Sequence, residues 1–176
     1  NLKIGTSVIA TGKINTFIKN GNYQFNISTI KLNGVGSNYD LLELNKDRYS
    51  KLGYFDDIRK KKLLKVNRVC IITAIAGAAL QDIMHVFQTN NFIGEISVKN
   101  VSVQGNSCPS SVVAALQETD KLNFDVILIT RGGGSKEDLY QFNDSLIVEQ
   151  IYKMKTFVLT AIGHEIDISL IDYVAD

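Results

Sequence analysis

Polar and apolar residues alternate in short runs between residues 4 and 32. The runs are interrupted at Thr11-Gly12 and at Asn20-Gly21-Asn22, and Asn and Gly accept the positive φ angles that hairpin turns need. The pattern predicts an antiparallel β meander over residues 1–36 that is too short to close into a barrel. We therefore expect further strands upstream, in a longer protein.

The next segment, residues 37–67, combines helical spacing with positive charge. Leucines and a tyrosine recur at loosely helical intervals over 41–52, and the basic run Arg59-Lys60-Lys61-Lys62 follows. We interpret the segment as a helical, basic linker between two units.

From residue 68 onward, apolar runs of buried-strand length alternate with helical patterns. The predicted strands are 69–73, 96–103, 126–130 and 157–161, and the predicted helices are 77–89, 109–119 and 136–153. Strands that are apolar on both sides predict an α/β fold, an open and mostly parallel sheet with helices on both faces. Ligands of such sheets bind beyond the carboxyl ends of the strands.

Charge is distributed unevenly along the chain. Residues 1–67 hold 12 Lys and Arg against 5 Asp and Glu, a net +7, and residues 68–176 hold 7 against 13, a net −6, which together give +1. A basic front segment suggests a polyanionic partner, and a solvated basic face explains the charge equally well.

The composition excludes several classes of protein. Apolar residues make up 45% of the 176 and charged residues 21%, which is typical of a globular domain. No uncharged apolar stretch reaches the roughly 18 residues of a transmembrane helix, and the first residues lack the pattern of a signal peptide. Cys70 and Cys108 cannot build a disulfide framework, so we expect two free thiols in the cytoplasm.

The segment TRGGGSKEDL follows the third apolar run directly and is the most informative motif. It holds three consecutive glycines, Gly132, Gly133 and Gly134. Their N–H groups are open to a phosphate because no Cβ blocks its approach. Ser135 is predicted to cap a helix with Asp138 as its capping-box partner, and Arg131 adds a fork suited to phosphate oxygens. The alternative is a tight turn whose Arg makes a structural ion pair.

The segment AIGHEIDISLID follows the fourth apolar run. His164 can act as a general base or acid near neutral pH, and Asp167, three residues on, can orient it, bind a metal or cap a helix. The alternative is a packed histidine beside a capping aspartate.

Two further features are less specific. Asp82, in the first helix of this region, is by itself best interpreted as a solvated carboxylate. Gln104-Gly105 is best interpreted as an ordinary turn, although its glycine also permits close backbone approach.

Five segments of the chain resemble the exonuclease VII large subunit family. RGGGSKEDLYQFND and AIGHEIDISLIDYVAD resemble its two signature segments, and TAIAGAALQDI and VSVQG resemble two further blocks in the right order. KLGYFDDIRKKKLL resembles the connection between the family's OB-fold and its catalytic domain. The turn Thr73-Ala74-Ile75-Ala76-Gly77 departs from the family, which usually has hydroxyl residues there.

The resemblance implies a domain order. Residues 1–36 would be the C-terminal part of an OB-fold nucleic-acid-binding domain, 37–67 the linker, and 68–176 an α/β nuclease domain truncated on its C-terminal side. It implies a cytoplasmic bacterial enzyme that cuts single-stranded DNA from both ends to oligonucleotides, in a complex with several copies of a small helical subunit.

The resemblance also implies the site residues. The family's polar catalytic set falls on Asp82, Arg131, His164 and Asp167. We expect phosphate or DNA to contact the glycine loop with Ser135, the turn Gln104 and Gly105, and the basic residues Lys60, Lys61 and Lys62. Asp82 and Asp167 are candidate ligands for Mg²⁺ or Mn²⁺. The alternative function is a non-catalytic module that binds single-stranded DNA or a nucleotide.

Overall fold

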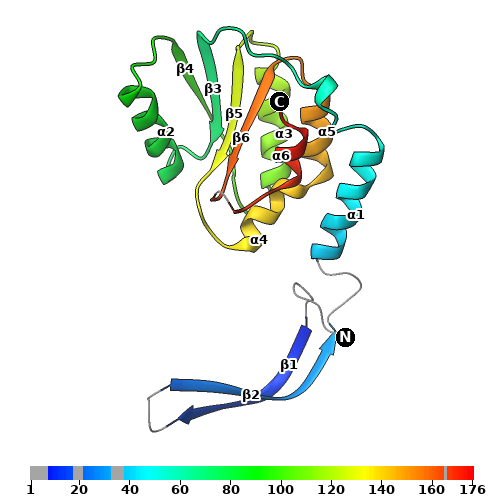
Figure 1. The fold of residues 1–176 in the computed structure, drawn as a ribbon. Coiled ribbons are helices and arrows are strands. Elements are labelled where there is room, and N and C mark those ends of the chain that lie inside the picture. The colour runs from blue at the N-terminus through cyan, green and yellow to red at the C-terminus, as the bar shows by residue number, and fades with distance from the viewer. Residues whose placement is uncertain (1–7, 18–21, 33–37, 165) are drawn as a thin grey trace. The chain divides into compact units, whose positions relative to one another are not determined.

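A computed structural model describes residues 8–17, 22–32, 38–164 and 166–176 (Figure 1). The chain divides into two compact units, Asn1–Asp47 and Arg48–Asp176. Across the described residues, no helix has the length and apolar character that crossing a membrane requires.

The first unit contains a two-stranded antiparallel ribbon. β1 (Val8–Phe17) pairs with β2 (Asn22–Leu32), and the register shifts between Thr11 and Gly12. The bulge is held by Ser28 Oγ, which donates to Thr11 O at 2.9 Å. The predicted break at Thr11-Gly12 is therefore wrong in detail, since one strand continues through it, while the predicted turn at 20–22 lies largely outside the described residues.

The second unit is a parallel sheet with connecting helices. It begins with the end of α1 (Asn38–Lys51) and the 3₁₀ turn η1 (Asp57–Arg59). Then follow β3 (Arg68–Thr73), α2 (Ala78–Thr89), β4 (Glu95–Asn100), α3 (Cys108–Thr119), β5 (Val126–Arg131), α4 (Lys136–Leu139), η2 (Tyr140–Asn143), α5 (Ser145–Lys153), β6 (Phe157–Ile162) and α6 (Leu170–Val174). The strand order is β4-β3-β5-β6, all parallel. The predicted α/β class is confirmed.

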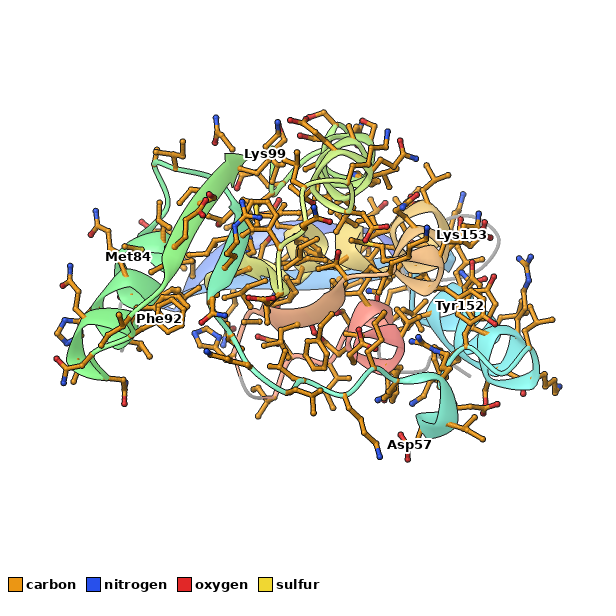
Figure 2. The ribbon with its side chains drawn as sticks, turned by 90° about the horizontal axis from the view of Figure 1, so that it is seen from above. Asp57, Met84, Phe92, Lys99, Tyr152 and Lys153 are labelled. Atoms are coloured by element: carbon orange, nitrogen blue, oxygen red, sulfur yellow. The ribbon has the colours of Figure 1, made fainter. Side chains whose placement is uncertain are left out.

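Both faces of the sheet are covered. Val69 and Ile71 of β3 pack with the apolar stripe of α2, and Figure 2 shows Met84 and Phe92 on that side of the sheet. Successive strand residues point to opposite faces, and Cys70 and Ile72 are also buried. On their face α3 packs on β3, and α5 packs against α3.

Two predicted elements are corrected. The single helix over 136–153 is three pieces, because the Asp144 carboxylate accepts from the N–H of Leu146 at 2.8 Å and starts α5 anew. The strand predicted over 96–103 ends at Asn100, after which Val101 donates its N–H to Thr73 O. The helix after the glycine loop, α4, thus has only four residues, so its dipole is far smaller than a long helix would give.

The segment between α1 and β3 packs on the sheet unit. Tyr54 stacks on Tyr152 of α5 with ring centroids 3.8 Å apart, and the Arg59 guanidinium lies over the same ring. Lys61 donates its backbone N–H and its ammonium to the side chain of Asp176, at 2.7 and 2.6 Å. That carboxylate also accepts from the N–H of Val158, so the segment is tied to the edge strand β6.

Candidate active site

Arg131 ends β5 and is buried, with 7% of the residue exposed. Its guanidinium donates to Gly132 O and to the Asp138 carboxylate, both at 3.3 Å. Asp138 is held in turn by Ser135, whose Oγ accepts the Asp138 N–H at 3.2 Å. The predicted cap at Ser135 is present, and Asp138 turns its side chain toward the arginine.

The three glycines of the loop differ in what surrounds them. A Cβ on Gly134 would collide with the guanidinium of Arg131, and one on Gly133 would lie 2.8 Å from Nε2 of His164. A Cβ on Gly132 would make only an ordinary contact, 3.7 Å from Ala79 Cβ. Two of the glycines therefore make room for the two side chains on which the sequence hypothesis rests.

His164 follows β6 through a sharp turn. Gly163 has φ +70° and donates its N–H to Arg131 O at 2.9 Å, which fastens the end of β6 to the end of β5. The Asp167 carboxylate accepts the backbone N–H of His164 at 2.9 Å and lies 3.4 Å from Nδ1 of its ring. The imidazole is 75% exposed, so a substrate can reach it.

A second polar cluster fixes the segment that follows. The Asp172 carboxylate accepts from Thr160 Oγ1 at 2.5 Å and from the N–H and hydroxyl of Ser169 at 2.7 and 2.8 Å. Asn143 Oδ1 accepts the N–H of Leu170 at 2.7 Å. The first signature thus holds the start of α6 in the second.

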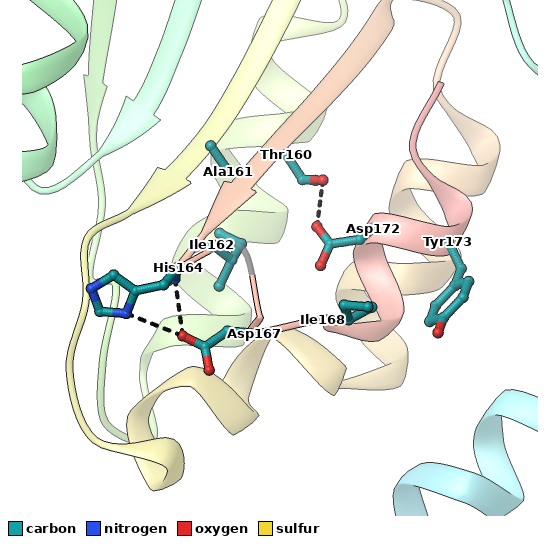
Figure 3. A pocket seen from close by; sticks show the side chains of 9 residues that line it. Thr160, Ala161, Ile162, His164, Asp167, Ile168, Asp172 and Tyr173 are labelled. Atoms are coloured by element: carbon teal, nitrogen blue, oxygen red, sulfur yellow. Dashed lines mark hydrogen bonds and ion pairs between the residues drawn. The ribbon is translucent and has the colours of Figure 1, made fainter.

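A hollow of about 520 Å³ opens beside His164, between β6 and α6 (Figure 3). It is lined by Thr160, Ala161, Ile162, Gly163, His164, Asp167, Ile168, Asp172 and Tyr173. In Figure 3 the ring of His164 points toward the loop after β5, and Ile168, Asp172 and Tyr173 lie on the opposite side. The histidine therefore separates the glycine loop from the hollow.

Not every predicted residue joins this group. Asp82 is exposed on α2, one turn beyond the Ala79 that borders Gly132. Gln104 and Gly105 are exposed after β4, at the other edge of the sheet, and Gly105 has φ +71°. Among the described residues, the structure gives no hydrogen bond or ion pair from these three to Arg131 or His164.

The basic run is divided by its contacts. Lys61 is committed to Asp176, whose side chain is 1% exposed, and Lys60 lies 3.8 Å from the exposed Asp57. Lys62 is exposed, without an ion pair to any described residue. Lys62 can therefore offer its charge to DNA, whereas the charge of Lys61 is already paired with Asp176.

The possible metal ligands are scattered in the described part of the chain. Within the described part of the chain, no group of three or more His, Cys, Asp and Glu side chains could hold a metal ion. Asp82 and Asp167 are not members of such a group among the described residues, and their binding of Mg²⁺ or Mn²⁺ stays a prediction.

The two cysteines are poor nucleophiles. Burial raises the pKa of the Cys70 thiol to about 11, and burial likewise raises that of Cys108 to about 11 although Arg131 opposes the shift. Both thiols are free and buried, so neither takes part in chemistry at the site.

Sequence reasoning missed the capping box at the start of α6 and the long-range partners of two aspartates. The first had a local signal, because the spacing Ser169-x-x-Asp172 is typical of a capping box. No local signal identifies Thr160, whose partner Asp172 is 12 residues away, or Asp176, which pairs with Lys61 across 115 residues.

Chemically, the group can act on a phosphate ester. Arg131 places a permanent cation beside the loop N–H groups, where it is buried and paired with Asp138. An accessible imidazole with a carboxylate at Nδ1 can move a proton. The glycines place these two functions on either side of one loop.

Comparisons with known proteins agree with this chemistry. The family described as "Exonuclease VII, large subunit" matches residues 54–176. The chain is 41% identical to an exodeoxyribonuclease 7 large subunit of Campylobacter hominis over 175 residues, 99% of this chain and 45% of that protein. It is 38% identical to that of Oceanobacillus iheyensis, covering 98% of this chain and 38% of the relative. It is 37% identical to the exodeoxyribonuclease 7 large subunit of Nautilia profundicola, covering 99% of this chain and 41% of the relative.

The chain spans less than half the length of these relatives. The family match nevertheless covers most of the sequence, including both loops that form the candidate site. The chain belongs to the exonuclease VII large subunit family.

Proposed function

We propose that this chain carries the hydrolytic site of an exodeoxyribonuclease VII large subunit, which cuts phosphodiester bonds of single-stranded DNA from both ends to give oligonucleotides. The observation that carries the proposal is the contact between the two signature loops, where Gly133 faces His164 and Gly134 faces Arg131. One loop therefore borders both a cation and a proton-transfer group.

Each side chain has a role in the proposed reaction. Arg131 and the N–H groups of the loop stabilise the charge that develops on the phosphate. His164 activates the attacking water or protonates the leaving oxygen, and Asp167 orients its ring. Asp82, carried over from the family pattern, is proposed as a polar partner that completes the site in the whole protein.

No step of this proposal runs through a metal, because the described residues do not assemble a set of ligands. Mg²⁺ or Mn²⁺ stays a proposal for the complete enzyme, where Asp82 or Asp167 would have to combine with further donors. Activity measured with Mg²⁺ and with EDTA decides the question.

The proposed partners are single-stranded DNA and several copies of the family's small subunit, and the proposed location is the cytoplasm. Lys62, which is exposed, and Lys60, whose side chain is 30% exposed, are the members of the basic run that we propose for DNA contact. Such contacts contribute affinity that falls with salt.

One observation favours a second candidate function, a module that binds single-stranded DNA or a nucleotide without cutting it. The loop between β3 and α2 carries Ala74, Ile75 and Ala76, so it offers no side-chain hydroxyl to a phosphate, and Ile75 is 55% exposed. This candidate predicts salt-sensitive binding and no product oligonucleotides.

The test uses the full-length large subunit assembled with its small subunit. End-labelled single-stranded and duplex DNA are incubated with the wild-type complex and with His164→Ala, each with Mg²⁺ and with EDTA. We expect the wild-type complex to degrade single-stranded DNA and to leave duplex DNA intact. We expect His164→Ala to bind single-stranded DNA without cutting it. Cleavage by His164→Ala would contradict the assignment, and binding without cleavage by the wild type would favour the second candidate.

A further inference from the structure

The hollow beside His164 has a chemistry of its own. Ala161, Ile162, Ile168 and Tyr173 give it apolar and aromatic walls. Its volume of about 520 Å³ lies within the range of roughly 300–1,000 Å³ that is usual for small-molecule sites. Ile168 presents 62% of its surface to solvent, so a ligand in the hollow can contact its side chain.

The charges in the hollow exclude a phosphate as its occupant. Among the described residues that line it, the carboxylates are Asp167 and Asp172, and none is a Lys or Arg. A phosphate would be repelled there and attracted to Arg131, across the ring of His164 (Figure 3). A neutral, flat group with N–H donors fits the apolar walls and the carboxylates better.

We propose that the hollow binds the base of the nucleotide next to the scissile phosphate. This inference rests on the proposed function, because it takes the phosphate to lie between Arg131 and His164. The base then lies on the far side of the imidazole, against Ile168 and Tyr173. His164 stands between the base and the phosphate, next to the bond that is hydrolysed.

Asp172 allows the subsite to accept any of the four bases. Its Oδ1 accepts one hydrogen bond, from Thr160, and a carboxylate oxygen can accept two. Each of the four DNA bases carries at least one N–H on its pairing edge, so each can donate to this oxygen. The subsite therefore needs a base but does not select one.

The test removes the base and keeps the backbone. The full-length enzyme with its small subunit is given end-labelled single strands in which one thymidine is replaced by an abasic tetrahydrofuran residue. We expect cleavage at a bond adjoining that residue to fall about tenfold, the usual contribution of stacking one base. Cleavage at bonds further away should be unchanged.

Two variants locate the effect. Ala161→Leu fills the hollow from an exposed position on β6, and Ala161→Ser keeps it open as a matched control. We expect Leu to raise KM for the normal strand and to abolish the difference between the normal and abasic strands. Ser leaves the hollow open, so that difference should persist. The abasic comparison in the wild type does not depend on either variant folding.

The outcomes separate the two proposals. A drop beside the abasic residue that disappears in Ala161→Leu supports the base subsite. Equal cleavage of every bond by the wild type would overturn the subsite and leave the proposed function intact. Absence of cleavage of any strand by the wild type would overturn both.

Discussion

The imidazole of His164 lies against the backbone of Gly133, where a Cβ would be 2.8 Å from Nε2. The next residue, Gly134, leaves the corresponding space for the guanidinium of Arg131. Contiguous glycines are usually read as a phosphate cradle. In this protein two of them also set where His164 and Arg131 lie, so the loop separates the two proposed catalytic side chains as well as forming the proposed phosphate site.

Asp167 is predicted to act through His164. Asp167→Asn keeps an oxygen for the backbone N–H of His164 and removes the negative charge beside Nδ1. We expect cleavage of single-stranded DNA by the full-length enzyme to fall about 100-fold with little change in DNA binding. Single-turnover kinetics and filter binding measure the two effects, and a loss confined to binding would contradict the role.

Asp172 is predicted to stabilise the segment that carries His164. Its carboxylate accepts three hydrogen bonds, from Thr160 and from both donors of Ser169. In Asp172→Asn the amide nitrogen faces donors, so we expect the free energy of unfolding to fall by about 1–3 kcal/mol. Urea denaturation measures this, with Asp82→Asn on the exposed face of α2 as the control that should change little.

Stability should depend on pH through Asp176. Burial raises the pKa of its carboxyl, but hydrogen bonds from Lys61 and from the N–H of Val158 outweigh burial and hold the pKa below its ordinary value. A depressed pKa means that the carboxylate stabilises the fold fully above the ordinary value of about 3.9 and loses that contribution as pH falls through the folded value.

Denaturation of the wild type and of Asp176→Asn at a series of pH values tests this. We expect the variant to be less stable by about 1–3 kcal/mol at pH 7, with the difference shrinking below about pH 4. Asp57→Asn is the control, because Asp57 is 97% exposed and only 3.8 Å from its lysine. A difference that grows toward acid pH would contradict the assignment.

The thiols should be inert in the folded protein. Burial raises the pKa of both Cys70 and Cys108 to about 11, so the reactive thiolate is scarce at pH 8. We expect Ellman's reagent to detect two thiols per chain only after unfolding in guanidinium. Rapid reaction of either cysteine in the native protein would show that its environment is more open than the structure indicates.

Local patterns predicted the sheet well, because buried parallel strands are apolar on both sides and their runs are easily seen. The sequence did not predict the order β4-β3-β5-β6, since pairing depends on contacts distant along the chain. The helix over 136–153 was predicted as one because apolar spacing continues through it, and an aspartate that caps a helix looks, in sequence, like one on its surface.

The candidate site was predictable as far as its strand ends. Arg131 and His164 follow neighbouring strands, and carboxyl ends of parallel strands meet at one edge. The steric role of Gly133 and Gly134 was not predictable, because it depends on where the two side chains point. Nor was the engagement of Lys61 by Asp176, since a charge in a basic run gives no sign of a buried partner 115 residues away.

The most direct measurement compares Gly133→Ala with Gly132→Ala in the full-length enzyme with its small subunit. Both add one methyl group to the same loop, but only the first collides with His164, while the second meets Ala79 at an ordinary distance of 3.7 Å. We predict that Gly133→Ala lowers cleavage of end-labelled single-stranded DNA by about 100-fold or more, as the displacement of an active-site group does. Gly132→Ala adds its methyl group beside the proposed phosphate site but leaves His164 in place, so its loss of cleavage should be much smaller. Equal activity of the two variants would contradict the claim that this loop positions His164 for the proposed catalysis.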